Sequence, residues 1–369
     1  MINPNTQALH ALGQSLWLDN ISRELLGSGT LARYIAELSV TGLTSNPTIF
    51  EQAIGHGDAY DEQIGALTQA GWSGEDLFFA LAEQDLRQAA DLFRPIHRAT
   101  GGVDGWVSLE VSPLLVDDTA GSTLAAARLH TAAARPNVFI KIPGTPAGVK
   151  AIEDSIFAGV PINVTLLFSG EHYIAAAEAY LRGIERRVKA GLDPKVESVA
   201  SVFVSRWDVA VKEDVQPQLH NRLGVAIAMR TYKAHCELLA SERWQRLAAA
   251  GARPQRLLWA STGTKDPAAP DTLYVEALAA AQTIDTIPEK TLLAFADHGK
   301  LGATLPADGG YAEAVLDEFK REGVDDEALA AQLQREGVQA FAKSWSGLMV
   351  RIQEKSSQPT ATAARVGAA

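Results

Sequence analysis

Short apolar runs alternate with longer segments of helical spacing along the whole chain. Eight runs have the length and residue types of buried β-strands. They cover residues 15–19, 40–45, 105–111, 137–142, 162–168, 199–205, 256–261 and 291–297. The segments between them, such as 123–134 and 169–191, place Ala, Leu and Glu at helical spacing. A strand followed by a helix, eight times in succession, predicts an α/β fold of the (β/α)8 barrel type.

The alternative to a barrel is a doubly wound open sheet, which carries a glycine-rich turn after its first strand. The segment "LDNIS" at that position has no glycine. We expect extra helices in three places: two over 48–100, more than one over 205–250, and a C-terminal helical extension. The acidic stretch 306–328 is expected to form a plain surface helix. One barrel domain over 1–355 and a disordered tail over 356–369 are therefore predicted.

Polar side chains share one face of the predicted strands, because strand residues alternate between two faces. We expect the aliphatic faces, which include Leu166 in 162–168 and Leu258 with Ala260 in 256–261, to contact the helices. The other faces should point into the barrel. There the polar residues would meet at the C-terminal strand ends, where barrel enzymes hold their active sites. The polar residues on these faces are Asp19, Glu110, Lys141, Asn163, Thr165 and Ser261.

Lys141 lies within the apolar run "NVFIKI", although lysine is almost never fully buried without a partner. A cavity with little water disfavours the ammonium form. The neutral amine can attack a carbonyl carbon and form a Schiff base. Asp19 and Glu110 could shuttle protons in such a reaction. They could equally hold the lysine charged in a buried ion pair, and the strand pattern leaves both interpretations open.

The charge and the cysteine content exclude several classes of function. The net charge is −11 and no basic run of five residues occurs, which disfavours nucleic acid as a partner. The single cysteine, Cys236, excludes an intramolecular disulfide and a thiolate zinc site. No apolar stretch is long enough to span a membrane, and the first residues lack the features of a secretory signal. We therefore expect the protein in the cytoplasm.

A helical stripe near the C-terminus is expected to pack into the core, as such stripes usually do. Its members are Phe341, Trp345, Leu348, Met349 and Ile352.

Several segments, including "SLWLDNISRELL" (15–26), "GLTSNPTIFEQAI" (42–54), "VSLEVSPLLVDDTAGS" (107–122) and "NVFIKIPGTPAGVKAIE" (137–153), resemble the transaldolases in their longer bacterial form. The resemblance continues in order over residues 159–169, 198–208, 257–267 and 274–299. It implies a (β/α)8 barrel and a class I aldol mechanism without metal or cofactor. The implied reaction belongs to the pentose phosphate pathway. It transfers dihydroxyacetone from sedoheptulose 7-phosphate to glyceraldehyde 3-phosphate, giving erythrose 4-phosphate and fructose 6-phosphate.

The resemblance also implies roles for single residues. Lys141 matches the Schiff-base lysine, and Asp19 matches the acid/base of carbon–carbon cleavage and formation. Glu110 and Thr165 match the pair that positions a catalytic water. The residues matched to substrate binding are Asn46 and Asn163 for the hydroxyl groups, Ser201, Phe203 and Arg206 at the phosphate site, and Ser261 and Lys265 after the seventh strand. Shorter members carry an arginine in that last region, where this chain reads "STGTKDP" with Lys265.

Two other functions stay open from the sequence. A fructose-6-phosphate aldolase-like enzyme would release free dihydroxyacetone, but such aldolases tend to carry glutamine at the position of Glu110. A non-catalytic sugar-phosphate-binding barrel would keep Arg206 without needing Lys141 and Asp19 together. The implied partners are sugar phosphates, with neither nucleic acid nor membrane, and the chain is expected to be a monomer or a homodimer.

Overall fold

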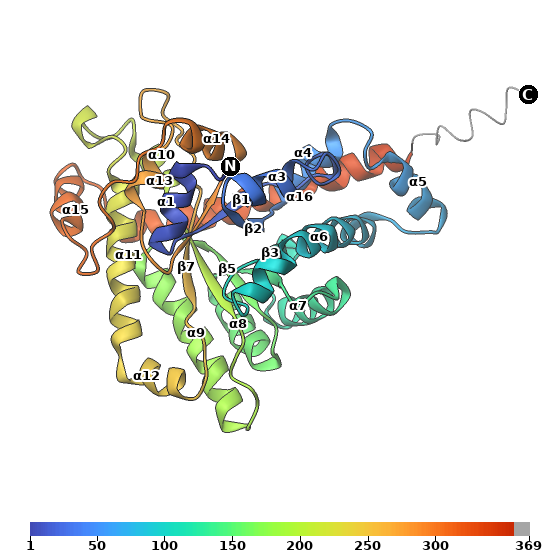
Figure 1. The fold of residues 1–369 in the computed structure, drawn as a ribbon, viewed down its shortest axis with the longest axis horizontal. Coiled ribbons are helices and arrows are strands. Elements are labelled where there is room, and N and C mark those ends of the chain that lie inside the picture. Colours follow the sequence, from blue (N-terminus) through green and yellow to red (C-terminus); the bar gives the residue numbers. More distant parts are fainter. Residues whose placement is uncertain (358–369) are drawn as a thin grey trace, which may run out of the picture.

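Eight parallel strands close into a barrel in the order β1 to β8 in the computed structural model, which describes residues 1–357 (Figure 1). The strands are β1 (Ser15–Asp19), β2 (Val40–Thr44), β3 (Val107–Glu110), β4 (Val138–Pro143), β5 (Ile162–Leu167), β6 (Ser198–Phe203), β7 (Arg256–Ala260) and β8 (Ile284–Ile287). This confirms the predicted (β/α)8 barrel and excludes the open sheet. Residues 358–369 of the expected tail lie outside the described part of the chain.

The helices around the barrel are more numerous than a minimal barrel requires. Up to β4 they are α1 (Pro4–Leu12), α2 (Arg23–Gly27), α3 (Thr30–Glu37), α4 (Pro47–Gly55), α5 (Asp61–Gln69), α6 (Gly74–Ala99) and α7 (Thr119–Ala133), with the 3-10 turn η1 (Pro113–Leu115). From β4 to β7 they are α8 (Pro146–Ala158), α9 (Gly170–Lys189), α10 (Ser205–Val211), α11 (Leu223–Ala240) and α12 (Glu242–Ala249), with η2 (Pro217–Leu219). The last four are α13 (Leu273–Ala277), α14 (Glu289–His298), α15 (Ala312–Arg321) and α16 (Asp326–Ser356).

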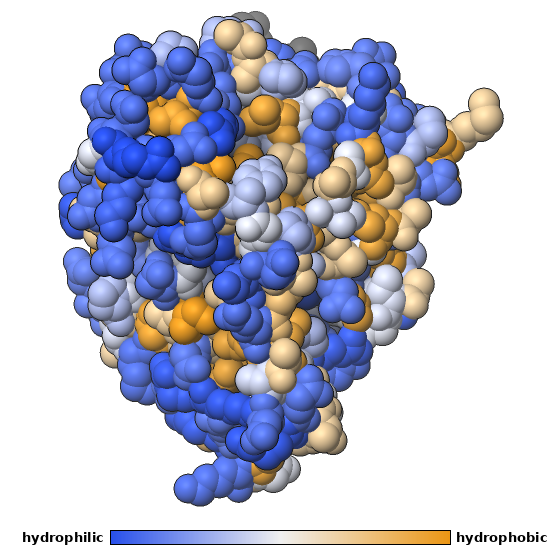
Figure 2. Space-filling model, turned by 90° about the vertical axis from the view of Figure 1, so that its left-hand side faces the viewer, coloured by the Kyte–Doolittle hydropathy of each residue, from blue (hydrophilic) through white to orange (hydrophobic). Residues whose placement is uncertain are grey.

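The extra helices agree with the sequence in position more than in number. Three helices, α4, α5 and α6, fill the segment where two were expected. Helix α15 in the acidic stretch is an amphipathic surface helix. It packs Val315, Leu316 and Phe319 on its buried face, contacts α11, and leaves Glu313, Asp317 and Lys320 exposed. The face of the molecule on the side of α11 and α15 is largely hydrophilic with small apolar patches (Figure 2). No helix within residues 1–357 is both long and apolar enough to cross a membrane.

The eighth strand lies earlier in the chain than expected. Residues 291–297 belong to helix α14, which begins after Pro288 and buries Leu292 and Phe295 on one face. The true strand β8 has only four residues, Ile284–Ile287, and carries Asp285 in its middle. Aspartate is depleted in strands, so the apolar run beyond it was the stronger signal.

The two faces of strand β7 are the reverse of the expected ones. Leu258 and Ala260 pack inside the barrel in the same cluster as Trp17 and Phe139, whereas Trp259 packs with the residues that contact the helices. Ser261 nevertheless lines the interior cavity, because its backbone turns into the left-handed region with a φ of 55°. Trp259 can therefore face the helices while Ser261, two residues later, still faces the cavity.

Leu166 was expected on the same face as Ile162 and Val164, but it belongs to a different cluster and packs against Gly337 of α16. Its φ is 58°, and the pairing of β5 with β6 shifts between Val164 and Leu167. Such an irregularity in a strand re-aims the side chains that follow it. Strand β5 thus turns Leu166 toward helix α16 directly after Thr165.

Aromatic rings fill the barrel below the C-terminal strand ends. The rings of Trp106 and Phe139 stack with centroids 4.1 Å apart, and Trp17 lies 6.3 Å from Phe139. A Cβ atom at Gly42 would lie 2.5 Å from the Trp17 ring, so only glycine allows β2 to pass there. The indole of Trp17 donates to Asp104 at 2.8 Å. This packed layer gives the site above it a rigid floor.

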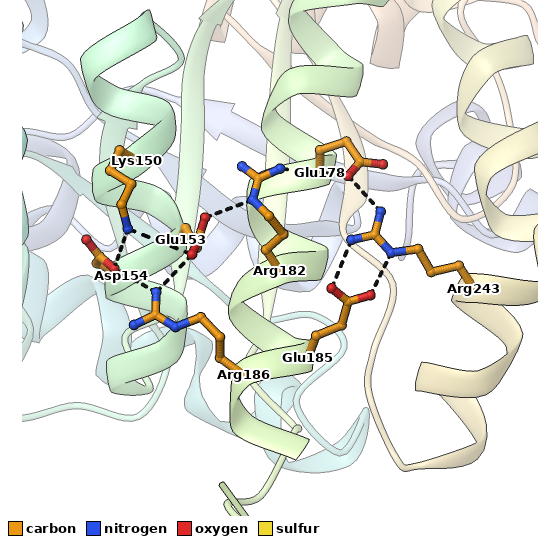
Figure 3. A network of polar contacts seen from close by, with 8 residues as sticks. All are labelled: Lys150, Glu153, Asp154, Glu178, Arg182, Glu185, Arg186 and Arg243. Atoms are coloured by element: carbon orange, nitrogen blue, oxygen red, sulfur yellow. Dashed lines mark hydrogen bonds and ion pairs between the residues drawn. The ribbon is translucent and has the colours of Figure 1, made fainter. Parts of the chain in front are cut away.

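Charged side chains join three outer helices, α8, α9 and α12 (Figure 3). Arg243 of α12 contacts Glu178 and Glu185 of α9, each at 2.6 Å. Arg182 of α9 contacts Glu153 of α8 at 2.8 Å. These pairs are partly exposed, so each contributes at most about 1 kcal/mol. Their role is to fix the outer layer rather than to perform chemistry.

Asp285 provides a test of how β8 is packed. The carboxyl group is fully buried, accepts one hydrogen bond from Thr262 at 2.8 Å, and keeps Oδ2 without a partner among residues 1–357. Burial raises the pKa of Asp285 from 3.8 to about 7. The unfolded chain therefore loses this proton near pH 4 while the folded chain holds it, so the free energy of unfolding falls as the pH rises from about 4 to about 7.

The Asp285→Asn variant should lose this contribution, which amounts to about 1.4 kcal/mol per pH unit. Urea unfolding at pH 5, 6 and 7 measures the slope. The same change at exposed Asp58 is the control and should leave the slope unchanged. An Asp285→Asn slope equal to that of the unmodified protein would contradict the burial of this carboxyl group.

Candidate active site

A cavity of about 400 Å³ opens at the C-terminal ends of the strands. Nine of the eleven predicted site residues line it: Asp19, Asn46, Lys141, Thr165, Ser201, Phe203, Arg206, Ser261 and Lys265. Glu110 and Asn163 do not line the cavity and lie buried next to residues that do. A larger neighbouring cavity of about 730 Å³ shares Asp19, Ile49 and Gln52 with it, but the lysine belongs to the smaller one.

Lys141 and Glu110 form a buried ion pair at the base of the cavity. Their side chains are 7% and 5% exposed, and Nζ lies 3.4 Å from Oε2 of Glu110. The two residues are register partners on β4 and β3, which places their side chains next to each other. Nζ also donates to the Ser45 carbonyl at 3.0 Å. The ammonium group is thus held by one charge and one backbone oxygen.

The carboxyl group of Glu110 is close to its titration point at neutral pH. Burial raises its pKa from 4.5 to about 7; the Lys141 charge opposes this shift, and the Asp19 charge adds to it. Neither oxygen of Glu110 accepts a hydrogen bond from residues 1–357. The group can therefore bind or release a proton next to the lysine amine.

Asp19 ends strand β1 and is held by two threonines. Thr44 Oγ1 donates to Asp19 Oδ1 at 2.8 Å and lies 2.6 Å from Thr286 Oγ1. Because Thr44 has a single hydroxyl hydrogen, Thr286 must donate to Thr44. Burial raises the pKa of Asp19, while the charge of Lys141 and the Thr44 hydrogen bond oppose the rise. Asp19 therefore has a fixed orientation and an increased tendency to hold a proton.

The two threonines were missed by the sequence reasoning. Thr44 lies late in the predicted strand 40–45, so its position could have suggested a role. Thr286 lies in the short strand that was not recognised. The C-terminal helix was expected to contribute only to the core, but its Phe341 also lines the cavity. The rest of the stripe packs as expected, with Trp345, Leu348 and Ile352 buried and Met349 partly buried.

A chain of hydrogen bonds runs beneath the cavity floor. Ser201 donates to Asn163 Oδ1 at 2.7 Å, and Asn163 Nδ2 donates to Ser108 Oγ at 3.2 Å. Asn163 is fully buried, so this chain orients Ser201 from below. The Thr165 hydroxyl, by contrast, has no hydrogen-bond partner among the described residues.

Asn46 serves as the N-cap of helix α4 and lines the cavity at the same time. Its Oδ1 accepts the backbone N–H of Ile49 at 3.1 Å, as is typical of an asparagine cap. The cap fixes the side-chain orientation and occupies only the oxygen. The Nδ2 group keeps its two hydrogens available for a ligand hydroxyl.

The opposite wall of the cavity is cationic, although the protein carries a net charge of −11. The Arg206 guanidinium stacks over the Phe203 ring, 5.1 Å from its centroid. Burial lowers the pKa of Arg206, and the field of Glu336 partly opposes this shift. No ion pair or hydrogen bond within residues 1–357 occupies the guanidinium. Exposed Lys265 lies on the same cavity, so this wall can bind an anion such as phosphate.

Ser205, the first residue of helix α10, joins this helix to the segment that follows β7. Its hydroxyl lies 2.9 Å from the Ser261 hydroxyl, and its backbone N–H donates to the Ser261 carbonyl at 3.0 Å.

No group of three or more His, Cys, Asp or Glu side chains among the described residues is arranged to hold a metal ion.

A buried lysine beside carboxyl groups at this end of a (β/α)8 barrel is typical of enzymes that form covalent intermediates with carbonyl substrates. Residues 16–352 match the family model described as Transaldolase/Fructose-6-phosphate aldolase. The chain therefore belongs to this family.

Curated relatives match over nearly the full length. A transaldolase of Thermobifida fusca is 45% identical over 358 residues, covering 95% of this chain and 97% of its own. A transaldolase of Thiobacillus denitrificans is 44% identical, with 94% and 99% covered. A transaldolase of Mycolicibacterium smegmatis is 43% identical, with 95% and 97% covered.

The cationic wall can be tested with inorganic phosphate. Arg206→Met keeps an unbranched side chain as far as the position of Nε and removes the guanidinium. Loss of charge-assisted hydrogen bonds of about 1.5–3 kcal/mol should weaken phosphate binding roughly tenfold to a hundredfold. The measurement is the phosphate-dependent increase in melting temperature. Arg335→Met, at an exposed position of α16, is the control and should respond like the unmodified protein. An equal response of Arg206→Met would exclude Arg206 from the anion site.

Proposed function

We propose that this protein is a transaldolase of the pentose phosphate pathway that works through a Schiff base on Lys141. It transfers dihydroxyacetone from sedoheptulose 7-phosphate to glyceraldehyde 3-phosphate and forms erythrose 4-phosphate and fructose 6-phosphate. The observation that carries the proposal is the buried lysine, paired with Glu110 at 3.4 Å, in a cavity that also holds Asp19 and Arg206. Membership of the family and the names of its relatives support it.

The first step is imine formation. Glu110 takes a proton from the Lys141 ammonium, and the neutral amine attacks the ketose carbonyl carbon C2. The resulting carbinolamine loses water, so that the C2–O bond is replaced by a C=N bond to Nζ. Glu110 and Thr165 hold this water, and the free hydrogen-bonding capacity of both side chains supports that role.

The second step breaks the bond between C3 and C4. Asp19 accepts the proton of the C4 hydroxyl, the electron pair of the C3–C4 bond moves into the iminium, and an aldose phosphate leaves. The increased proton affinity of Asp19, caused by burial, suits this role. In the reverse direction the protonated Asp19 donates to the aldehyde oxygen of the acceptor. The hydrogen bond from Thr44 at 2.8 Å keeps the carboxyl group in place for both directions.

The three-carbon unit then stays bound as an enamine until an acceptor arrives. The phosphate of either sugar is held by Arg206 and Lys265, with Ser201 and Ser261 beside them and Phe203 under the guanidinium. The Asn46 amide donates to a hydroxyl group of the bound unit. A contact between substrate and Asn163 stays a prediction, because this amide is buried and already hydrogen-bonded.

The rival activity within the family is an aldolase that releases free dihydroxyacetone. Glu110 favours the transferase, because a carboxyl group rather than a glutamine amide lies beside the lysine. A non-catalytic barrel is not favoured. We also propose that residues 1–355 form one domain. The cytoplasmic location and the monomeric or homodimeric state stay predictions.

Lys141→Met should abolish turnover while the protein stays folded. Without the amine no imine forms, so kcat/KM should fall by at least about a thousandfold. The reaction is measured by the formation of erythrose 4-phosphate and, in parallel, of fructose 6-phosphate. The same assay without acceptor detects free dihydroxyacetone, which would dominate in an aldolase. Lys150→Met, which removes an exposed lysine of α8, should keep full activity. Normal turnover in Lys141→Met would refute the mechanism.

The role of Glu110 predicts a pH dependence. The carboxylate form is the base, so kcat/KM should rise as the pH increases through about 7, the pKa to which burial raises this group. Glu110→Gln should be slower and should lose this limb of the profile. Steady-state rates between pH 5.5 and 8.5 measure it. An unchanged limb in Glu110→Gln would assign the titration to another group.

A further inference from the structure

Helix α16 packs against α4, α5, α6 and strand β5, and lies alongside α4 in Figure 1. Gln334, Gly337 and Phe341 are three and four residues apart, so they share one face of this helix. Phe341 lines the cavity. The helix face that carries Gln334 and Gly337 therefore also forms part of the cavity wall, through Phe341.

Gln334 joins the ends of two catalytic strands. Its Nε2 donates to the carbonyl of Gly144 at 3.2 Å and to the carbonyl of Leu166 at 3.0 Å. Gly144 directly follows β4, which carries Lys141, and Leu166 directly follows Thr165 in β5. One amide group, with two hydrogens, thus serves one carbonyl on each strand.

We propose that Gln334 is a positioning residue that holds the ends of β4 and β5 at the spacing that Lys141 and Thr165 require. The inference rests on the proposed function, because it assigns a task within that reaction. Gln334 touches no reacting atom. Its effect passes through the backbone of the two strands.

The backbone at this point needs an external support. Leu166 has a φ of 58°, a left-handed conformation that costs a non-glycine residue about 1 kcal/mol or more. The Gly144 N–H donates to the Thr165 carbonyl at 2.7 Å, so a backbone hydrogen bond also joins the two strand ends. Without Gln334, the two carbonyls that it serves would lose their side-chain donor. The strand ends could then separate or rotate.

Gly337 allows the helix to approach closely enough for this contact. A Cβ atom at this position would lie 2.9 Å from Leu166 Cδ2 and 3.4 Å from Arg206 Nη1. The helix backbone therefore packs directly on the left-handed residue and beside the phosphate-binding guanidinium. The close packing of α16 at Gly337 thus holds Gln334 within hydrogen-bond distance of the two carbonyl groups.

The test uses Gln334→Met, which keeps the length and removes both donors, and Gln334→Glu, which replaces them with acceptors. Because small displacements of reacting groups are costly, kcat should fall about tenfold or more, with KM for fructose 6-phosphate changed less than about twofold. Amide hydrogen exchange should accelerate in peptides covering residues 137–168. The matched controls are Gln339→Met and Gln339→Glu, which make the same changes at an exposed position of α16.

A lower melting temperature with unchanged kcat would overturn the inference, because it would show a structural contact only. Unchanged exchange in residues 137–168 would overturn it as well. The exchange measurement does not depend on turnover. If the unmodified protein lacked transaldolase activity, the proposed function would fail, and the exchange result would still decide whether Gln334 holds the strand ends.

Discussion

A lysine ammonium group enclosed in an apolar barrel is costly unless a counter-charge and hydrogen-bond acceptors surround it. In this chain the register of β3 against β4 provides the counter-charge, since it sets Glu110 directly beside Lys141. The Ser45 carbonyl completes the surroundings of Nζ. Replacing a buried ion pair with apolar residues often stabilises a protein. Its presence at the C-terminal end of the barrel therefore fits a chemical role better than a stabilising one.

The surrounding structure separates charges of opposite sign around this pair. Asp19 and Glu110 lie within range of the Lys141 charge, and burial increases their affinity for protons. Arg206 and Lys265 form the outer wall, where an anion can bind in spite of the net charge of −11. We propose that a sugar phosphate binds with its phosphate at this cationic wall and its carbonyl at the lysine. Stacked aromatic rings fill the barrel below the site, and Phe341 of helix α16 forms part of the cavity wall.

The barrel follows from the alternation of strands and helices, and a period of two along the strands brings their polar residues to one end. The other site residues, Asn46, Ser201, Phe203, Arg206 and Lys265, were implied only by the family resemblance. This period alone predicts that Asp19, Glu110 and Lys141 meet at one end of the barrel. It fails where the backbone departs from a regular strand, as at Leu166 with its positive φ, and where a tryptophan rather than an aliphatic residue faces the helices. Gln334 is beyond the reach of a local pattern, because its partners are 190 and 168 residues away in the chain.

The most direct test of the account is whether Lys141 becomes covalently bound to substrate. The protein is incubated with fructose 6-phosphate, reduced with borohydride, digested and examined by peptide mass. The account predicts a reduced dihydroxyacetone adduct on the peptide that contains Lys141, and on no other lysine peptide. Unmodified Lys141 in folded protein that still binds phosphate would contradict the account, and the lysine would then be a binding or structural cation.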